Sequence, residues 1–357
     1  MAEKPGYWDG LLRRRVSRRR ALQAAALGGA GLATATALSC ENDAEEGIAP
    51  TLITAPGRPG DVTDTPTRRG QMDQEDVHPL ISEGKVMVTP GVYDVLSAKI
   101  AEMVGFPAVV LTGYGVSASH LGEPDFGLLT QTEVLDVARR VTAAVGIAVI
   151  VDGDTGYGGA LNVQQMIREL IRMGARGVIL EDQRWPKRCG HMRDKQVIDA
   201  EEHAAKLRAA RDARGEVPFV IVGRTDALET HGLDEAIRRA RLYKEAGADV
   251  LFVEGPRSRD ELRRIGRELP GPLAVNLIEG GRTPLYPLEE LVDMGFYSIG
   301  FVLSGLYAAA RALERTYAEL RAQGTTEGIK EALMPFDEFN ALIGLEDRYA
   351  TDERYRP

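Results

Sequence analysis

The chain contains few cysteines, few histidines and few aromatic residues. Its 357 residues include two cysteines, five histidines and 6% aromatic residues. If Cys40 is removed or modified, Cys189 is left alone and no internal disulfide can form. The histidines show no metal-ligand spacing, which argues against a zinc site. After the first fifty residues, no segment is apolar enough to be a second membrane span.

The chain also lacks the excess of positive charge that nucleic-acid binding requires. Its formal net charge is −9. Residues 1–37 carry seven basic and two acidic residues, so the rest of the chain carries a net charge of −14. Because phosphate contacts need a basic face, the composition excludes nucleic acid as a partner.

Residues 1–40 have the pattern of an export signal. A basic stretch, "RRRVSRRR", precedes a short run of small and apolar residues. Ser17, Arg18, Arg19 and Leu22 resemble the twin-arginine type, whose machinery exports folded proteins. The sequence therefore predicts an exported protein, periplasmic or on the cell surface, and a cytoplasmic one if the signal is not used. A basic amphipathic helix or a disordered arm is the alternative.

Two ways of processing this segment remain open. Cleavage after the small residues 35–37 would release the chain, whereas lipid attachment at Cys40 would anchor it. Residues 41–77 are rich in Pro, Gly and Thr without periodicity, which predicts a flexible tether.

From Val86 onward, short β-branched runs alternate with amphipathic helical stretches. The runs are "VMVT", "AVVLT", "IAVIVDGD", "GVILED", "FVIVGRTD", "DVLFVEG", "PLAVN" and "YSIGFVLS". Near-continuous apolar strands separated by helices indicate a parallel sheet. Eight such units match a (β/α)8 TIM barrel, whose usual length is ~250 residues. We predict the barrel over residues 78–325 and a helical extension over 326–357. An open doubly wound sheet would need a glycine-rich loop that "VTPGVYD" does not supply.

Polar residues recur where the predicted strands end. They are Thr112, Gly113, Asp152, Asp154, Glu181, Asp182, Arg224, Asp226, Glu254, Asn276 and Glu279. Barrel enzymes place their chemistry at this end, and charged side chains are seldom buried unless they are paired or bind metal. The set therefore predicts an active site, although Asp226 taken alone would fit a helix N-cap.

Three of these carboxylates suggest a metal site. Residues i and i+2 of a strand face the same side, so Asp152 and Asp154 should enter one space, beside Glu181. Oxygen ligands of this kind suit Mg²⁺, with Mn²⁺ as a second option. No lysine ends a predicted strand, which argues against a Schiff-base aldolase.

Cys189 lies in a charged stretch, "EDQRWPKRCGH". The neighbouring Lys187, Arg188 and His191 should stabilise its thiolate and lower the pKa of the thiol. A reactive cysteine is the interpretation we favour, and an incidental exposed cysteine is the alternative.

Several motifs occur in the order found in one enzyme family. They are "VDGDTGYGG", "LEDQRWPKRCGHM", "GRTDA", "LFVEG" and "NLIEGGRTPL". Together they resemble the isocitrate lyase / phosphoenolpyruvate mutase superfamily from about residue 84 to residue 320. "KRCGH" is typical of its lyase branch, and the chain is most similar to members that cleave oxaloacetate and 2-alkylmalates.

The resemblance implies roles for individual residues. Asp152, Asp154 and Glu181 would hold Mg²⁺, with Asp125 contributing through water. Substrate would be bound by Thr112, Gly113, Tyr114, Gly190, Arg224, Glu254 and Asn276. Catalysis would involve Cys189, Lys187, His191 and Arg224, on or beside a mobile loop over residues 187–191.

The implied reaction is cleavage of a C2–C3 bond in a 2-hydroxy or 2-keto dicarboxylate. Cys189 would protonate the departing carbanion, and either Asp125 or Tyr114 would be the base. Tyr114 and Ile278 stand where methylisocitrate lyases have Gly and Thr, which predicts a narrower and drier pocket. A phosphonate-forming mutase and an exported, non-catalytic binding protein are the alternatives. The family also implies a homotetramer whose subunits exchange their last helix.

Overall fold

The computed structural model describes residues 86–356. The predicted export signal, the predicted tether and residues 78–85 of the predicted barrel domain lie outside these described residues. The structural statements below concern residues 86–356 alone.

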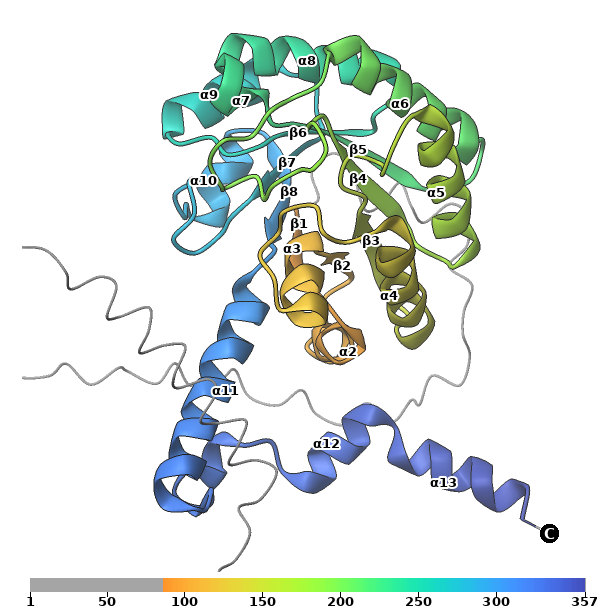
Figure 1. Cartoon of the computed structure of the whole chain (residues 1–357), viewed down its shortest axis with the longest axis vertical. Helices are drawn as coiled ribbons and strands as arrows, with labels where there is room; N and C mark the ends of the chain where they lie inside the picture. The colour runs from red at the N-terminus through yellow and green to blue at the C-terminus, as the bar shows by residue number, and fades with distance from the viewer. Residues whose placement is uncertain (1–85, 357) are drawn as a thin grey trace, which may run out of the picture. The chain divides into compact units, whose positions relative to one another are not determined.

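Eight parallel strands form a closed barrel (Figure 1). Each strand pairs with the next one along the chain, and β8 pairs with β1 to close the sheet. The strands are β1 Met87–Val92, β2 Ala108–Leu111, β3 Ala148–Asp152, β4 Gly177–Glu181, β5 Val220–Thr225, β6 Val250–Val253, β7 Leu273–Asn276 and β8 Phe296–Phe301. The predicted TIM barrel is confirmed. Each strand lies within the run expected from the sequence or extends past that run by a few residues at most.

Helices surround the barrel, as Figure 1 shows. The longer ones are α2 Val95–Met103, α4 Gln131–Ala144, α5 Ala160–Arg172, α6 Ala200–Arg214, α8 Leu233–Ala246, α9 Arg259–Glu268, α11 Ser304–Gln323 and α13 Leu345–Arg354. Shorter ones are α3 Gly113–Val116, the π-helical η3 Ser117–Leu121, α7 Ala227–His231, α10 Leu288–Asp293, the 3₁₀ segment η4 Glu327–Ala332 and α12 Phe336–Ile343. Local chemistry sets several boundaries. For example, Thr130 and Glu133 form a reciprocal capping box that starts α4.

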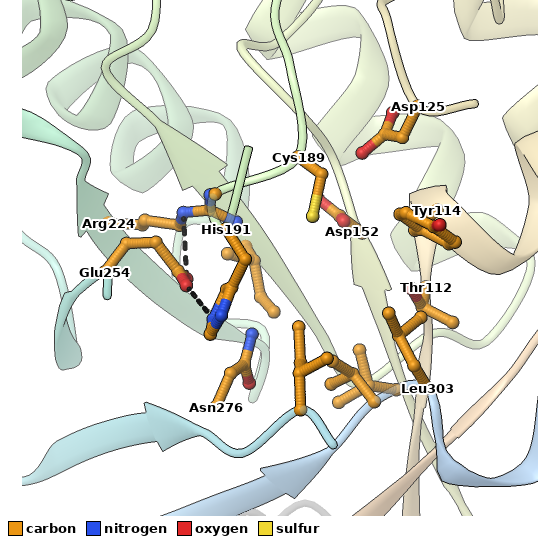
Figure 2. Close-up of a pocket in the computed structure, with 15 residues that line it drawn as sticks. Thr112, Tyr114, Asp125, Asp152, Cys189, His191, Arg224, Glu254, Asn276 and Leu303 are labelled. Atoms are coloured by element: carbon orange, nitrogen blue, oxygen red, sulfur yellow. Dashed lines mark ion pairs between the residues drawn. The ribbon is translucent and has the colours of Figure 1, made fainter. Parts of the chain in front are cut away.

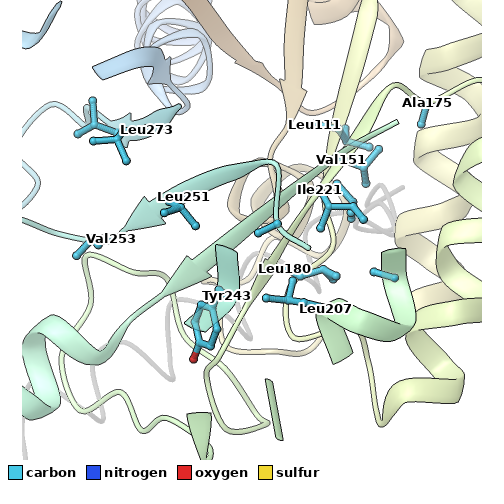
Figure 3. Packing of buried hydrophobic residues seen from close by; sticks show 14 of the residues in the cluster. Leu111, Val151, Ala175, Leu180, Leu207, Ile221, Tyr243, Leu251, Val253 and Leu273 are labelled. Atoms are coloured by element: carbon cyan, nitrogen blue, oxygen red, sulfur yellow. The ribbon is translucent and has the colours of Figure 1, made fainter. Parts of the chain in front are cut away.

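The apolar core has two layers because alternate strand residues face opposite ways. In β2, Val109 and Leu111 face the helices, whereas Ala108 and Val110 belong to a separate cluster inside the barrel. Figure 3 shows part of the outer layer, a cluster that joins strand residues such as Leu180 to helical residues such as Leu207. At the carboxyl ends of the strands the inner cluster includes Ile278, Val302 and Leu303, and polar side chains share that rim with it.

The C-terminal helices differ from the barrel helices. α11 carries no buried residue, and its Leu313, Tyr317 and Leu320 side chains are exposed. α12 packs against α2. Among the described helices, none is both long and apolar enough to cross a membrane.

A buried histidine lies between the barrel and its outer helices. His203 of α6 is fully buried and packs edge-on against Tyr243 of α8, with ring centroids 4.6 Å apart. Burial, together with the nearby Lys206 charge, lowers the pKa of His203 to about 3. The folded protein therefore holds this imidazole in its neutral form at physiological pH.

His203 should make the fold sensitive to mild acid. In the unfolded chain the imidazole takes up a proton as pH falls below its ordinary pKa of 6.5, but in the folded chain it does not. The neutral, buried imidazole therefore contributes fully to the free energy of unfolding above that pH. On acidification this contribution is lost, and the free energy of unfolding falls by about 2 kcal/mol at pH ~5. We expect His203→Gln to flatten the fall in urea stability between pH 7 and 5. His231→Gln, at an exposed histidine, should keep the wild-type slope, and equal slopes for all three proteins would contradict the assignment.

Candidate active site

A cavity of about 30 Å³ opens at the carboxyl ends of the strands (Figure 2). Its lining comes from strand ends and the loops that follow them. The lining residues are Val110, Thr112, Tyr114, Asp125, Asp152, Ile179, Cys189, Gly190, His191, Arg224, Glu254, Asn276, Ile278, Val302 and Leu303. Most of the residues predicted for the site are thus brought together, whereas Gly113, Asp154, Glu181 and Lys187 lie behind this lining.

The acidic side of the cavity is built around Gly113. Its backbone N–H donates to Oδ2 of Asp152 over 3.2 Å. A Cβ at this position would lie 3.1 Å from Oδ2 of Asp152 and 3.2 Å from Oδ1 of Asp154, so both carboxylates approach the same point. The reason why the two carboxylates converge differs from the one expected from the sequence. β3 ends at Asp152, and Asp154 reaches this space from a left-handed backbone with φ of 48°, not by strand alternation.

Lys187 is bound to these acids and does not line the cavity. Its buried ammonium lies 2.7 Å from Asp125 and 2.5 Å from Asp154. Gly113 likewise uses its N–H on Asp152, so it does not offer this group to a ligand as expected. The contacts of Lys187 and of the Gly113 N–H group differ from the predicted ones for the same reason: a buried charge or donor pairs with the nearest protein partner.

The buried carboxylates of Asp154 and Glu181 have properties that suit the binding of a cation. Burial raises the pKa of Asp154 to about 6, and burial likewise raises the pKa of Glu181 well above its ordinary value. Oε1 of Glu181 is buried and accepts no hydrogen bond from the described residues. Within residues 86–356 no group of three or more acidic, histidine or cysteine side chains is placed so that it could hold a metal ion by itself. This arrangement fits Mg²⁺, which commonly binds one or two carboxylates and keeps several waters.

Arg224 connects three buried carboxylates. It makes two hydrogen bonds to Asp226, of 2.8 and 3.0 Å, and lies 3.1 Å from Glu181 and 3.5 Å from Glu254. Burial acts to raise the pKa of Asp226, but the charges of Arg224 and Lys195 outweigh it and lower that pKa. Asp226 occupies the N-cap position of α7, as the alternative interpretation expected, but its side chain makes no capping hydrogen bond and pairs with Arg224 instead.

His191 has its ring fixed from both sides. Nδ1 accepts a hydrogen bond of 2.8 Å from the backbone N–H of Arg282, and Nε2 lies 2.8 Å from Glu254. Since Nδ1 is an acceptor, the ring proton is on Nε2 and faces the carboxylate. Figure 2 shows the resulting series from Arg224 through Glu254 to His191 at one wall of the cavity.

Cys189 lines the cavity, but its surroundings differ from those expected. Burial, followed by the negative charge of Asp125, raises the pKa of the thiol to about 12. The predicted lowering of the pKa is wrong because burial outweighs the cations, which are also paired with other groups. Lys187 pairs with its carboxylates, and the Arg188 guanidinium lies over the ring of Phe126. The group is held as a neutral thiol, which can donate a proton.

Close packing positions the residue after Cys189. A Cβ on Gly190 would lie 2.4 Å from both Arg224 and Glu254, so only glycine fits at this point. Gln183 binds the backbone of Arg188 with both ends of its amide, at 2.7 and 3.0 Å. Sequence reasoning did not select Gln183, although it lies within the motif that carries Cys189.

The opposite wall is apolar. Ile278, Val302 and Leu303 are nearly fully buried and line the cavity, with Val110 and Ile179 from the barrel interior. Sequence reasoning singled out Ile278 among these residues. The signal for the others is their inward position in or after a strand. Glu279, in contrast, binds Ser304 and does not line the cavity.

Comparisons with known proteins agree with this site. Residues 77–321 match the family model described as phosphoenolpyruvate phosphomutase. The chain is 53% identical to the petal death protein of Dianthus caryophyllus over 78% of this chain and 88% of that protein. It is 43% identical to 2,3-dimethylmalate lyase of Eubacterium barkeri over 77% and 96% of the two chains. A structure of oxaloacetate acetylhydrolase with 3,3-difluorooxalacetate has a TM-score of 0.74, at 36% identity, covering 78% of this chain and 96% of that one.

The chain belongs to the phosphoenolpyruvate mutase / isocitrate lyase superfamily. Its fold, its cavity and its named relatives make it a carbon–carbon lyase of that family, as the motifs predicted. The roles of individual site residues remain predictions.

Arg224 should be the side chain on which the stability of the site depends. Arg224→Met leaves three buried carboxylates without their partner, and loss of one partner of a buried ion pair costs about 3–5 kcal/mol. Arg140→Met, which breaks an exposed pair with Asp136, should cost less than about 1 kcal/mol. Urea unfolding measures both values. Similar small losses for the two variants would contradict the central role of Arg224.

Proposed function

We propose that this protein cleaves the C2–C3 bond of a 2-hydroxy or 2-keto dicarboxylate, of the oxaloacetate or 2-alkylmalate type, with Mg²⁺ as cofactor. One observation carries the proposal. A small cavity places a neutral thiol, a buried arginine and the carboxylates of Asp125 and Asp152 around one point. This combination can bind a small acid, stabilise developing negative charge and deliver a proton.

The apolar wall favours substrates with a short alkyl group. A third carboxylate, as in methylisocitrate, would have to face Ile278, Val302 and Leu303 without a polar partner from that wall. An unpaired buried charge is costly, so this wall disfavours methylisocitrate and isocitrate. An alkyl substituent or a bare methylene would fit there without such a cost.

Asp152, Asp154 and Glu181 would hold the metal ion, with Asp125 contributing through water, and Mn²⁺ would be the alternative ion. Bound Mg²⁺ supplies Lewis-acid polarisation of substrate oxygens. The unpaired oxygen of Glu181 and the convergence of Asp152 and Asp154 support this assignment.

The chain's own side chains then supply binding and proton transfer. Arg224 contributes positive charge and hydrogen-bond donors, and His191 lies beside it at the wall opposite Tyr114. A base, Asp125 or Tyr114, takes the proton of the C2 hydroxyl group, which in a 2-keto acid belongs to the hydrate formed with water. C2 becomes a carbonyl carbon as the C2–C3 bond breaks, and the electron pair of that bond stays on C3 of the departing acid. The thiol of Cys189 donates its proton to that carbon, and the cavity excludes competing water.

A substrate panel tests the proposed reaction directly. The purified chain with Mg²⁺ should release products from oxaloacetate or a 2-alkylmalate, and little or none from methylisocitrate or isocitrate. Products are followed by chromatography, with phosphoenolpyruvate included in the panel. Formation of a phosphonate would favour a mutase, and no product from any compound would refute the proposed cleavage.

Cys189→Ser keeps the size of the side chain but replaces the thiol by a much weaker acid. We expect turnover to fall by about 10²–10⁴, the usual scale for a general acid. Binding of a dicarboxylate inhibitor should stay within a few-fold of wild type. Cys40→Ser is the matched control and should keep full activity. Near-full activity of Cys189→Ser would rule out proton donation by this group.

Asp152→Asn removes one charge from the proposed metal site while preserving the shape of the side chain. Titration calorimetry should show weaker Mg²⁺ and Mn²⁺ binding, by about tenfold or more, and turnover should be lost. Asp136→Asn, at an exposed carboxylate on α4, should bind both ions as the wild type does. Undiminished turnover in EDTA would contradict the metal assignment.

We also propose that the protein is a homotetramer in which α11 packs on a neighbouring subunit. The support is that this 20-residue helix buries none of its side chains within the chain, although Leu313, Tyr317 and Leu320 are apolar or aromatic. Leu313→Glu should then dissociate the assembly in sedimentation experiments. A wild-type monomer at micromolar concentration would contradict the proposal.

Export by the twin-arginine route is proposed from the sequence alone. Cell fractionation should find the protein outside the cytoplasm. Replacement of Arg18 and Arg19 by lysine should block export and keep the protein in the cytoplasm. Equal fractions for both proteins would contradict this route.

A further inference from the structure

Three consecutive backbone carbonyl groups follow Cys189, and a cation holds each of them. Nζ of Lys195 donates to the carbonyl of Gly190. Nε and Nη2 of Arg282 donate to the carbonyls of His191 and Met192, over 3.0 and 2.9 Å. The position of the segment 189–192 therefore depends on two side chains from outside it.

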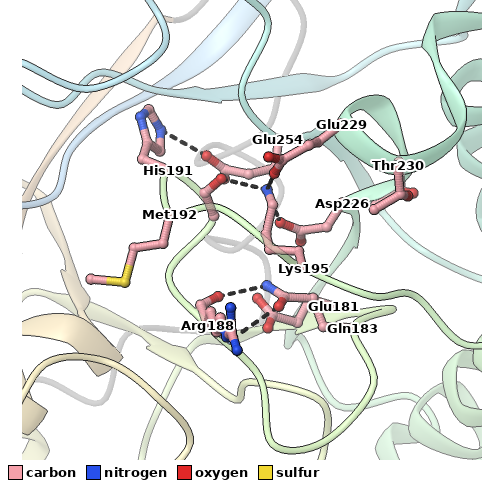
Figure 4. A network of polar contacts seen from close by, with 12 residues as sticks. Glu181, Gln183, Arg188, His191, Met192, Lys195, Asp226, Glu229, Thr230 and Glu254 are labelled. Carbon is pink, nitrogen blue, oxygen red and sulfur yellow. Dashed lines mark hydrogen bonds and ion pairs between the residues drawn. The ribbon is translucent and has the colours of Figure 1, made fainter.

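One carboxylate joins these two cations. Glu229 of α7 lies with Oε1 2.6 Å from Arg282 and Oε2 3.4 Å from Lys195. Glu229 does not line the cavity, and its side chain is 20% exposed. Figure 4 shows Glu229 and Lys195 beside the segment that contains His191 and Met192. We call Glu229, Lys195 and Arg282 the carbonyl clamp.

The clamp is also connected to the reacting side of the cavity. Lys195 lies 2.8 Å from Asp226, the carboxylate that holds Arg224. Arg282 donates its backbone N–H to His191, and the adjacent Gly281 permits this approach, since a Cβ there would lie 2.5 Å from the ring. Displacement of the clamp would thus move the cysteine segment and release the ring of His191 together.

We propose that the carbonyl clamp holds the segment 189–192 closed over the cavity, and that its release opens the cavity for exchange of substrate and product. Glu229, Lys195 and Arg282 are positioning residues that act through Cys189 and His191. The inference rests on the proposed function, because closure matters for catalysis only if Cys189 acts on a ligand in this cavity.

Alkylation of Cys189 measures opening without any substrate. The full chain is treated with iodoacetamide, and mass spectrometry of peptides follows Cys189 separately from Cys40. Arg282→Ala loses two charge-assisted hydrogen bonds to carbonyl groups, so we expect alkylation about tenfold faster or more. Glu229→Gln, which keeps the shape but removes the charge, and Arg282→Lys should lie between this variant and wild type. Arg259→Ala, at an exposed arginine paired with Glu290, should react as wild type does.

Two further measurements separate positioning from a general structural role. Hydrogen exchange should accelerate in peptides that cover residues 187–195 and stay unchanged in the barrel strands. Turnover in Glu229→Gln should fall more than its affinity for a dicarboxylate inhibitor. Wild-type alkylation rates in Glu229→Gln and Arg282→Ala would overturn the proposal, as would faster exchange throughout the barrel. Failure of the substrate panel alone would instead count against the proposed reaction, since alkylation reports opening whatever acid is cleaved.

Discussion

The ion pairs of Arg224 with Glu181, Asp226 and Glu254 are the constraint on which the rest of the site depends. Three carboxylates buried this close together would repel one another without a central cation. The charge of Arg224 offsets this repulsion, and each carboxylate also faces a further, different neighbour. Glu181 faces the proposed metal site, Asp226 holds Lys195, and Glu254 lies against His191.

Burial determines the chemical state of the site as strongly as charge does. Lys187 lies two residues before Cys189 in the sequence, yet its charge is paired with Asp125 and Asp154. Burial, followed by the charge of Asp125, keeps the thiol of Cys189 protonated by raising its pKa, which suits a proton donor better than a nucleophile. In the proposed function, the same exclusion of water would strengthen every electrostatic contact between Arg224 and a bound acid.

The proposed specificity and the proposed closure arise at different walls of the cavity. The apolar wall of Ile278, Val302 and Leu303 restricts what can occupy the end of the substrate, because nothing there can pair with a charge. Closure depends on the segment after Cys189. Arg282 holds this segment through backbone carbonyl groups, so these contacts do not depend on which side chains the segment carries. Substrate choice and opening could thus vary independently in related proteins.

The amino-acid sequence by itself determined the barrel and the location of its site. Strand and helix periodicity depend on neighbouring residues, so the eight strands could be predicted, and polar residues at their ends identified Asp152, Arg224, Glu254 and Asn276. Tertiary structure alone decided how charged groups pair. Arg282 reaches His191 across 91 residues, and Lys187 reaches Asp125 across 62, distances along the chain that no local pattern encodes. The pKa of Cys189 was misjudged for the same reason: neighbours in sequence suggested positive charge, whereas burial and the actual partners of those cations depend on the folded chain.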